Sequence, residues 1–266
     1  MELLTFEVRG KMAHFRKYYA NNTAFSFSIP PRTTLMGMVA AAMGWEKDSY
    51  YERLSTEHIR FGLRVLEPIK KSFHRVNFLR VETVGNLAKS MSSDLRGHGG
   101  RIQTPFEVIT PVELTRGEVA YKVFLGPSNT GDDVFQQIKR QLLDHPPVYN
   151  ISLGTANFQA SIGNIRAIEE PHVKEHNTND FVLMHSAVPS KLVKELAFEK
   201  ENLDRYNLVE EELLPGEFIA DYNRELKSMN RLLFSLSEKP LRVRLNGSYW
   251  MVSLDGKTLN VQFMDV

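Results

Sequence analysis

The sequence predicts an α+β fold, with a ferredoxin-like (RRM-like) βαββαβ unit over residues 1–170 and a smaller, mostly β region over residues 171–266. Two observations lead to this class. Periodic segments follow one another in the order strand, helix, strand, strand, helix, strand. A long stretch without core periodicity, residues 69–103, separates the second strand from the third and predicts an insertion at that point.

The first half of this unit is predicted from alternation and from helix signals. Residues 3–9 alternate apolar and polar side chains, which is typical of a half-buried strand. After Pro30-Pro31, Thr33 or Thr34 is expected to cap a helix that runs to Met43 and ends at Gly44. Residues 59–65 alternate again and predict the second strand.

The second half repeats this pattern after the insertion. Two extended segments, residues 106–114 and 119–125, precede a helix over residues 132–143 whose apolar stripe is Val134, Phe135, Ile138 and Leu142. A last strand is expected at residues 162–168. In the C-terminal region we expect short strands, one helix near residues 190–198, and hairpin turns at Asn246-Gly247 and Asp255-Gly256.

Composition excludes several classes of protein. The chain has 266 residues, 42% of them hydrophobic, which is enough for a substantial core. It has no cysteine, so disulfides, thiolate metal sites and cysteine nucleophiles are excluded. No apolar run of about 18 residues is present, and the N-terminus lacks the features of a signal peptide. We therefore expect a cytoplasmic protein.

Charge is distributed unevenly along the chain. The net charge is only +1, but residues 1–110 hold 16 basic and 10 acidic side chains, whereas residues 111–266 hold 17 and 22. Basic side chains gather at residues 9–17 and 70–101. Such clusters are typical of a polyanion-binding surface, although a solvated face is the common alternative.

Histidines within the basic clusters raise the possibility of catalysis. Metal-independent RNA cleavage needs a base for the 2′-OH, a cation and an acid, and His14, Lys17, Tyr18 and Tyr19 lie close enough in sequence to supply them, with His74 a further histidine in the second cluster. The same side chains serve equally well as phosphate or base contacts. An endoribonuclease is therefore the alternative to a binding protein.

Two other motifs give weaker signals. His172, Glu175 and His176 match the H-x-x-E-H pattern of inverted zincins, but that pattern needs a helix and Pro171 precedes it in a polar segment. The loop with Gly154, Thr155 and Asn157 follows a helix, so it is not a P-loop, although its glycine permits close approach to a phosphate. The aromatic side chains with which RRM domains stack bases are missing.

Three segments together resemble a known family. They are FEVRGKMAHFRKYY near the start, the helix SIPPRTTLMGMVAAAMGW and the loop LGTANFQASI. They are similar to the Cas-five family, the RAMP-type subunits that cap the crRNA 5′ end in type I CRISPR interference (Cascade) complexes, and most similar to the I-B branch. The resemblance covers about the first 170 residues. It implies that the ferredoxin-like unit is a palm and that the insertion at residues 69–103 is a thumb.

The resemblance also implies which residues bind RNA. Those on the palm edge would hold the repeat-derived 5′ handle, those of the thumb would grip it, and those of the glycine loop would approach its backbone. They are Arg9, Lys11, His14, Arg16, Lys17, Tyr18 and Tyr19; Lys70, Lys71, His74, Arg75, Arg80, Arg96, His98 and Arg101; and Gly154, Thr155 and Asn157. Bases would stack on Tyr18, Tyr19 or Phe25.

We thus predict a non-catalytic crRNA-binding subunit, without metal or cofactor, that acts in antiviral defence. Its expected partners are the 5′ handle of the guide, the Cascade backbone subunit and the Cascade large subunit, and target DNA near the PAM is a further candidate. The I-C branch of the family resembles an endoribonuclease that pairs a tyrosine with adjacent lysine and histidine residues. This chain has no adjacent Lys-His pair, which counts against cleavage.

Overall fold

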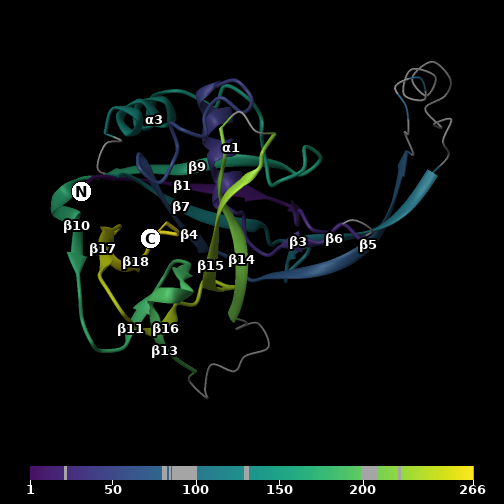
Figure 1. The fold of residues 1–266 in the computed structure, drawn as a ribbon. Coiled ribbons are helices and arrows are strands. Elements are labelled where there is room, and N and C mark those ends of the chain that lie inside the picture. The colour runs from purple at the N-terminus through teal and green to yellow at the C-terminus, as the bar shows by residue number, and fades with distance from the viewer. Residues whose placement is uncertain are drawn as a thin grey trace.

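The computed structural model describes residues 1–20, 23–79, 83, 85, 101–128, 132–198, 209–220 and 223–265. The α+β class predicted from the sequence is confirmed, because strands dominate this part of the chain and two α-helices accompany them. Figure 1 shows both helices on one side of a central sheet, with C-terminal strands on the other side. No described helix is long and apolar enough to cross a membrane.

The central sheet has five antiparallel strands in the order β4-β7-β1-β9-β8. Their bounds are β1 Leu3–Gly10, β4 Ile59–Val65, β7 Val119–Pro127, β8 Ile151–Ser152 and β9 Gln159–Ile168. Alternation on β1 divides its side chains between two faces. Leu4, Phe6 and Val8 pack in the core beneath the helices, whereas Leu3 packs in a second core against C-terminal strands. Both faces of the sheet are therefore covered.

Helix α1, Arg32–Met43, begins one residue before the predicted caps. Pro31 occupies the N-cap position and no side chain caps the helix, so Thr33 and Thr34 lie within the first turn and the predicted cap is wrong. Proline suits this place because it has no N–H group and its φ is already restricted. Gly44 ends the helix in the left-handed region, at φ 71°, as predicted.

Helix α3, Asp132–Asp144, confirms the second predicted helix. Phe135, Ile138 and Leu142 of its apolar stripe are buried, and the helix contacts α1, β7 and β9. Two acidic residues, Asp132 and Asp133, occupy its first turn, where they stabilise the helix dipole.

Strands β5, Ile69–Leu79, and β6, Arg101–Pro111, form an antiparallel ribbon, which we call the arm. The arm projects from the body (Figure 1) and begins where the insertion was predicted, at residue 69. The prediction of a separate strand at residues 106–114 is wrong, because most of that segment is the body-side end of β6. At its base, the short strands β2, Phe15–Arg16, and β3, Ser26–Phe27, pair with each other, and Ala13 and Ala24 bridge to β6. The segment that holds the first basic cluster therefore lies against the arm.

The C-terminal strands form two further sheets. One has six strands in the order β10-β17-β18-β11-β16-β13, and the other has three in the order β12-β15-β14. Their bounds, with two single 3₁₀ turns, are η1 Glu170–His172, β10 Val173–His176, β11 Val182–Met184, β12 Val188–Pro189, η2 Ser190–Leu192, β13 Val193–Ala197, β14 Val209–Phe218, β15 Leu226–Ser235, β16 Leu241–Leu245, β17 Tyr249–Leu254 and β18 Lys257–Val261.

Two C-terminal predictions are wrong. The helix expected near residues 190–198 is a 3₁₀ turn followed by β13, which pairs with β16 and forms an ion pair between Glu195 and Arg244. The turn at Asn246-Gly247 does not make a hairpin, because β16 and β17 are separated in the sheet by β11 and β18. The hairpin at Asp255-Gly256 is confirmed, and both residues have the positive φ that this turn requires.

The main core crosses the boundary expected at residue 170. Leu214, Leu232 and Phe234 from the three-stranded sheet pack in the same buried cluster as the residues beneath α1 and α3. An ion pair adds to this contact, since Nε of the fully buried Arg32 lies 2.6 Å from Oδ1 of Asp265 near the C-terminus. The C-terminal strands therefore help to hold α1 in place.

Candidate functional site

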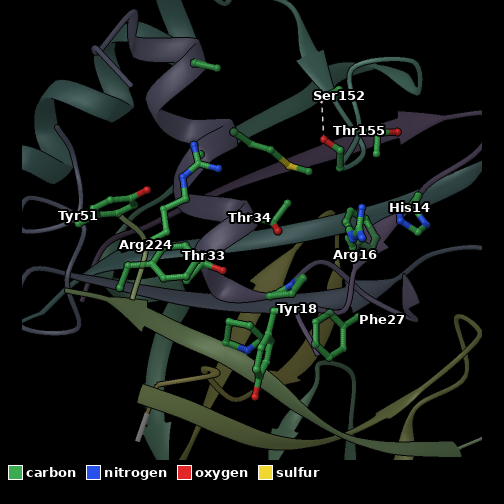
Figure 2. Close-up of a pocket in the computed structure, with 18 of the residues that line it drawn as sticks. His14, Arg16, Tyr18, Phe27, Thr33, Thr34, Tyr51, Ser152, Thr155 and Arg224 are labelled. Carbon is green, nitrogen blue, oxygen red and sulfur yellow. Dashed lines mark hydrogen bonds between the residues drawn. The ribbon is translucent and has the colours of Figure 1, made fainter. Parts of the chain in front are cut away.

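An open groove of about 810 Å³ runs along α1. Its walls come from five places: one face of α1, the segment around β2 and β3, residues 50 and 51 after α1, the loop at residues 150–155, and the end of the β14–β15 hairpin. Figure 2 shows His14 and Arg16 at one end and Tyr51 and Arg224 at the other, with Thr33 and Thr34 between them.

The start of α1 presents a positive end to this groove. Thr33 and Thr34 line it, no side chain caps the helix, and no acidic residue occupies the first turn. The helix dipole and uncapped first-turn N–H groups favour an anion at such a position. Arg32 holds this end in place, because its Nη2 donates hydrogen bonds to the carbonyl oxygens of Leu54 at 2.7 Å and Ile59 at 2.9 Å.

Arg16 is the exposed cation at the β2 end of the groove. It has no ion-pair partner among the residues that the structure describes. Tyr18 also lines the groove and stands edge-to-face with Tyr19, and both tyrosine rings are more than half exposed. A guanidinium beside exposed aromatic rings is suited to a single-stranded nucleic acid, which offers both phosphates and base faces.

His14 lines the same end but is buried, with only 1% of its surface exposed. Its Nδ1 lies 2.7 Å from the carbonyl oxygen of Glu107 and must donate to it, and the ring stacks on Phe106. Burial lowers the pKa of His14, and the charge of Arg16 lowers it further. The imidazole is therefore neutral, and its Nε2 is an acceptor that has no partner among the described residues.

The glycine loop lies directly against the His14 backbone. The amide of His14 donates to the carbonyl oxygen of Leu153 at 3.0 Å, and Gly154 has a φ of +94°. A Cβ on Gly154 would lie 1.8 Å from the carbonyl oxygen of His14, so only glycine fits here. Gly154 and Thr155 line the groove, whereas Asn157 is exposed beyond its lining.

The opposite end of the groove is built by the C-terminal hairpin. Arg224 lines it, and its Nε donates a 3.0 Å hydrogen bond to Oδ1 of Asp48. Tyr51, which also lines the groove, donates its hydroxyl hydrogen to the same carboxylate oxygen. Burial and the hydrogen bond to Asp48 raise the pKa of Tyr51, so the phenol stays protonated.

Most other cations of residues 9–17 are neutralised within the fold. Arg9 contacts Glu7 and Glu67, at 3.0 Å and 2.9 Å, and Lys11 lies 3.5 Å from Glu118. Neither residue lines the groove. Burial alone would raise the pKa of Glu7, but hydrogen bonds from Asn164 and Arg9 and the charge of Lys122 outweigh it and lower this pKa.

Glu212 on β14 joins the two basic clusters. Its Oε1 lies 2.9 Å from Nζ of Lys17 and 3.1 Å from Nζ of Lys71, and its Oε2 accepts a hydrogen bond from the amide of Ser28. All three side chains are largely buried at the base of the arm. Lys17 and Lys71 are therefore paired with a carboxylate, and neither lines the groove.

The arm carries exposed cations and aromatic rings. Lys70, His74 and Arg75 are exposed, as is Phe73, which stands edge-to-face with Phe25. Lys70 and Arg75 have no ion pair to any described residue, and His74 is 3.1 Å from the Ser72 hydroxyl. Arg80, Arg96 and His98 lie outside the described residues. Arg101 is described by its backbone alone, at the start of β6.

The H-x-x-E-H segment does not form the helix that zinc hydrolysis would require. His172 ends a 3₁₀ turn, and Glu175 and His176 lie on strand β10 with side chains on opposite faces. Glu175 accepts a hydrogen bond from Ser248, and His176 contacts the ring of Tyr249. In the described ranges no three metal-binding side chains gather in one place.

The structure thus unites Arg16, His14, Tyr18, Gly154 and Thr155 in one groove and leaves the arm residues outside it. Sequence reasoning missed the residues at the far end, Tyr51 and Arg224, and the carboxylate of Asp48 that joins them. Asp48 and Arg224 are far apart in the chain, so no local sequence pattern indicates that they are in contact. For Thr33 and Thr34 the sequence predicts only helix capping, whereas in the structure they line the groove.

Comparisons with known proteins identify the family and the fold. A family model, Cas_Cas5d, described as CRISPR-associated protein (Cas_Cas5), matches residues 3–212. Among solved structures, the chain is similar to a CRISPR protein from Archaeoglobus fulgidus, with 14% identity, 99% of each chain covered and a TM-score of 0.52, which shows a shared fold. A chain of a CRISPR RNA-guided surveillance complex has 13% identity, coverage of 97% of this chain and 91% of that one, and a TM-score of 0.45. A search of curated proteins finds no match.

Proposed function

The chain belongs to the CRISPR-associated Cas5 protein family, and on this premise we propose that it is a non-catalytic crRNA-binding subunit of a type I interference (Cascade) complex. In this proposal, residues 1–170 form the ferredoxin-like palm, the arm is the thumb, and residues 171–266 form a second region. The subunit grips the 5′ handle of the guide RNA in the cytoplasm and serves antiviral defence.

One observation carries this proposal: the groove combines an uncapped helix start, an exposed arginine and exposed aromatic rings. The start of α1 and Arg16 are suited to phosphate oxygens, and Tyr18 is suited to stacking on a base. Single-stranded RNA is recognised by this combination, because its unpaired bases are accessible. Gly154 permits close approach of the loop backbone to the chain.

The arm supplies a second surface beside the groove. We propose that its exposed Lys70, His74 and Arg75 contact the guide, together with Arg80, Arg96, His98 and Arg101 further along, and that its aromatic rings pack on the backbone subunit. The large subunit and target DNA near the PAM are further proposed partners. The matching model carries the Cas5d name, and we propose the I-B branch because the three segments described above are most similar to it.

A gel-shift experiment tests the binding role. Purified protein with EDTA is mixed with end-labelled repeat RNA, with and without the 5′ handle, and run on native and denaturing gels side by side. The expected result is an RNA that shifts, shifts more strongly with the handle, and stays intact. Equal shifts with both RNAs would contradict handle recognition.

His14 supports a second candidate, a metal-independent endoribonuclease. Its neutral imidazole with an unpartnered Nε2 has the protonation state of a general base, and Tyr18 and Arg16 lie at the same end of the groove. Discrete products on the denaturing gel, abolished by His14→Ala and unaffected by the arm variant His74→Ala, would favour this candidate. Tyr18 and Tyr19 are the next residues to replace.

A further inference from the structure

Arg224 lies beyond residue 212, where the family match ends, and yet it forms one wall of the groove. It belongs to the turn between β14 and β15, so its position depends on the packing of that hairpin against α1. Figure 2 shows its guanidinium beside α1, across the groove from Arg16. The C-terminal region therefore brings a cation to a site built otherwise by the first 155 residues.

The guanidinium of Arg224 is held in a defined orientation. Its Nε donates to Oδ1 of Asp48 at 3.0 Å, and the Tyr51 hydroxyl donates to the same oxygen. Burial would raise the pKa of Asp48, but these two hydrogen bonds outweigh burial and lower it, so the carboxylate stays charged. Asp48 is thus fixed from one side by Tyr51 and fixes Arg224 from the other.

This arrangement leaves the two Nη atoms of Arg224 available. Neither has a hydrogen bond to any residue that the structure describes, and about half of the side chain is exposed. An arginine held through Nε presents its Nη edge as a planar pair of donors, which fits two oxygens of one phosphate. The edge can therefore accept a ligand without breaking the contact to Asp48.

The backbone at this turn is also specialised. Asn223 and Arg224 both have positive φ, at 45° and 64°. Asparagine adopts this region more readily than most residues, arginine does so rarely, and two such residues in succession are typical of a tight hairpin turn. The conformation of the turn and the ion pair to Asp48 act together to set the direction of the Arg224 side chain.

Two cations at opposite ends suit an anionic chain that runs along the groove. Arg16 and Arg224 stand at its two ends, the positive end of α1 lies between them, and Glu225 is the carboxylate in the lining. A single small anion would need only one of these positions. Two phosphates of one RNA strand would use both.

We propose that Arg224 is a phosphate-binding residue that holds the guide RNA at the end of the groove opposite Arg16. Asp48 and Tyr51 are its positioning residues. This inference rests on the proposed function and extends it to the C-terminal hairpin. It makes the hairpin part of the RNA site, so that the palm alone does not hold the handle.

Salt-dependent binding of the full-length protein to end-labelled guide RNA tests this inference. Arg224→Ala should weaken binding about fivefold at 0.1 M salt and lower the salt slope by about 0.7, the value for one phosphate contact on a single strand. The matched control is Arg231→Ala, which removes an exposed arginine of the same hairpin that pairs with Glu211 and does not line the groove. It should change neither quantity. Equal effects of the two variants would overturn the inference.

Two further variants test orientation. Arg224→Lys should restore the salt slope but leave binding weaker than in the native chain, because lysine lacks the planar pair of donors. Asp48→Ala raises the net charge of the protein by one unit. If only net charge matters, this variant should bind RNA more tightly. If Asp48 orients Arg224 for the phosphate, the variant should bind RNA more weakly. Tighter binding would overturn the role of Asp48.

RNA binding by the native chain distinguishes a failure of this inference from a failure of the proposed function. If the native chain binds RNA without preference for the 5′ handle, the proposed function fails and this inference fails with it. If it prefers the handle and Arg224→Ala binds as the native chain does, only the inference about Arg224 fails.

Discussion

The two basic segments of the chain have similar composition but different surroundings in the fold. At residues 9–17, Arg9, Lys11 and Lys17 all have carboxylate partners, and Arg16 alone among the lysines and arginines there has no described partner. On the arm, Lys71 is paired at the base, whereas Lys70 and Arg75 extend into solvent. The difference teaches that a count of local charges does not measure the charge available to a ligand.

The carboxylates that cause this difference come from distant parts of the sequence. Glu67 and Glu118 neutralise the end of β1, and Glu212 neutralises Lys17 and Lys71 together. A paired, partly buried lysine would have to leave its carboxylate to contact a phosphate, which costs the interaction it gives up. RNA should therefore depend on cations whose donors are still available, either because they lack a partner, as in Arg16, or because a free edge remains beside the ion pair, as in Arg224.

The largest expected effect comes from removing two charges from each segment in turn. Lys70→Ala with Arg75→Ala should lower the salt slope of guide RNA binding by about 1.4 and weaken binding roughly 25-fold at 0.1 M salt. Arg9→Ala with Lys11→Ala removes the same charge from paired positions and should leave the slope nearly unchanged. Filter binding over a salt series measures the slope for both double variants. Equal losses of slope would contradict the difference between the two segments.

Adjacent residues provide a sharper form of the same test. Arg16→Ala should weaken RNA binding about fivefold at 0.1 M salt and lower the slope by about 0.7. Lys17→Ala should leave the slope almost unchanged and instead lower the melting temperature, because Glu212 loses a partner. A slope that falls only with Lys17→Ala would place the RNA on the other side of β2.

Glu212→Gln should move binding and stability in opposite directions. Loss of a largely buried carboxylate that pairs with two lysines should cost about 1–3 kcal/mol of unfolding free energy. The released Lys17 and Lys71 should strengthen RNA binding a few-fold and steepen its salt dependence. Thermal unfolding and filter binding measure the two effects, and weaker RNA binding would contradict the role given to Glu212.

The smallest expected effect concerns histidines. Because burial lowers the pKa of His14 below its ordinary value of 6.5, the unfolded chain binds more protons at this group. Stability should therefore fall as pH drops below about 6.5 toward the folded pKa. His14→Asn should reduce this loss between pH 7 and pH 5, as measured by urea unfolding. The exposed arm residue His74 supplies the control, His74→Asn, and equal effects of the two variants would contradict this assignment.

The sequence predicted the fold best where apolar residues recur with the period of a strand or a helix. Alternation in β1 and β4 and the stripe on α3 report packing directly, so their positions agree with the structure within a few residues. The outer half of the arm gave no such signal because its side chains on both faces are exposed or only half-buried. The helix expected near residues 190–198 failed because Leu192 and Leu196 have helical spacing but pack in the core of the six-stranded sheet.

The candidate site was less accessible to sequence reasoning. Arg16 and the glycine loop carry local signals, a basic cluster and a turn after a helix. The far end depends on contacts between residues about 170 positions apart, such as Asp48 and Arg224. Such contacts follow from tertiary packing of the β14–β15 hairpin on α1, which no local pattern reports.

Photo-crosslinking tests the central claim most directly, namely that the guide lies in the groove and along the arm. Guide RNA with 4-thiouridine placed in turn at each handle position is irradiated with the full-length protein, and crosslinked peptides are identified by mass spectrometry. We predict crosslinks to the peptides of Tyr18, Gly154 and Arg224 and to the arm. Crosslinks confined to the six-stranded sheet, around β10 and β17, would contradict the account.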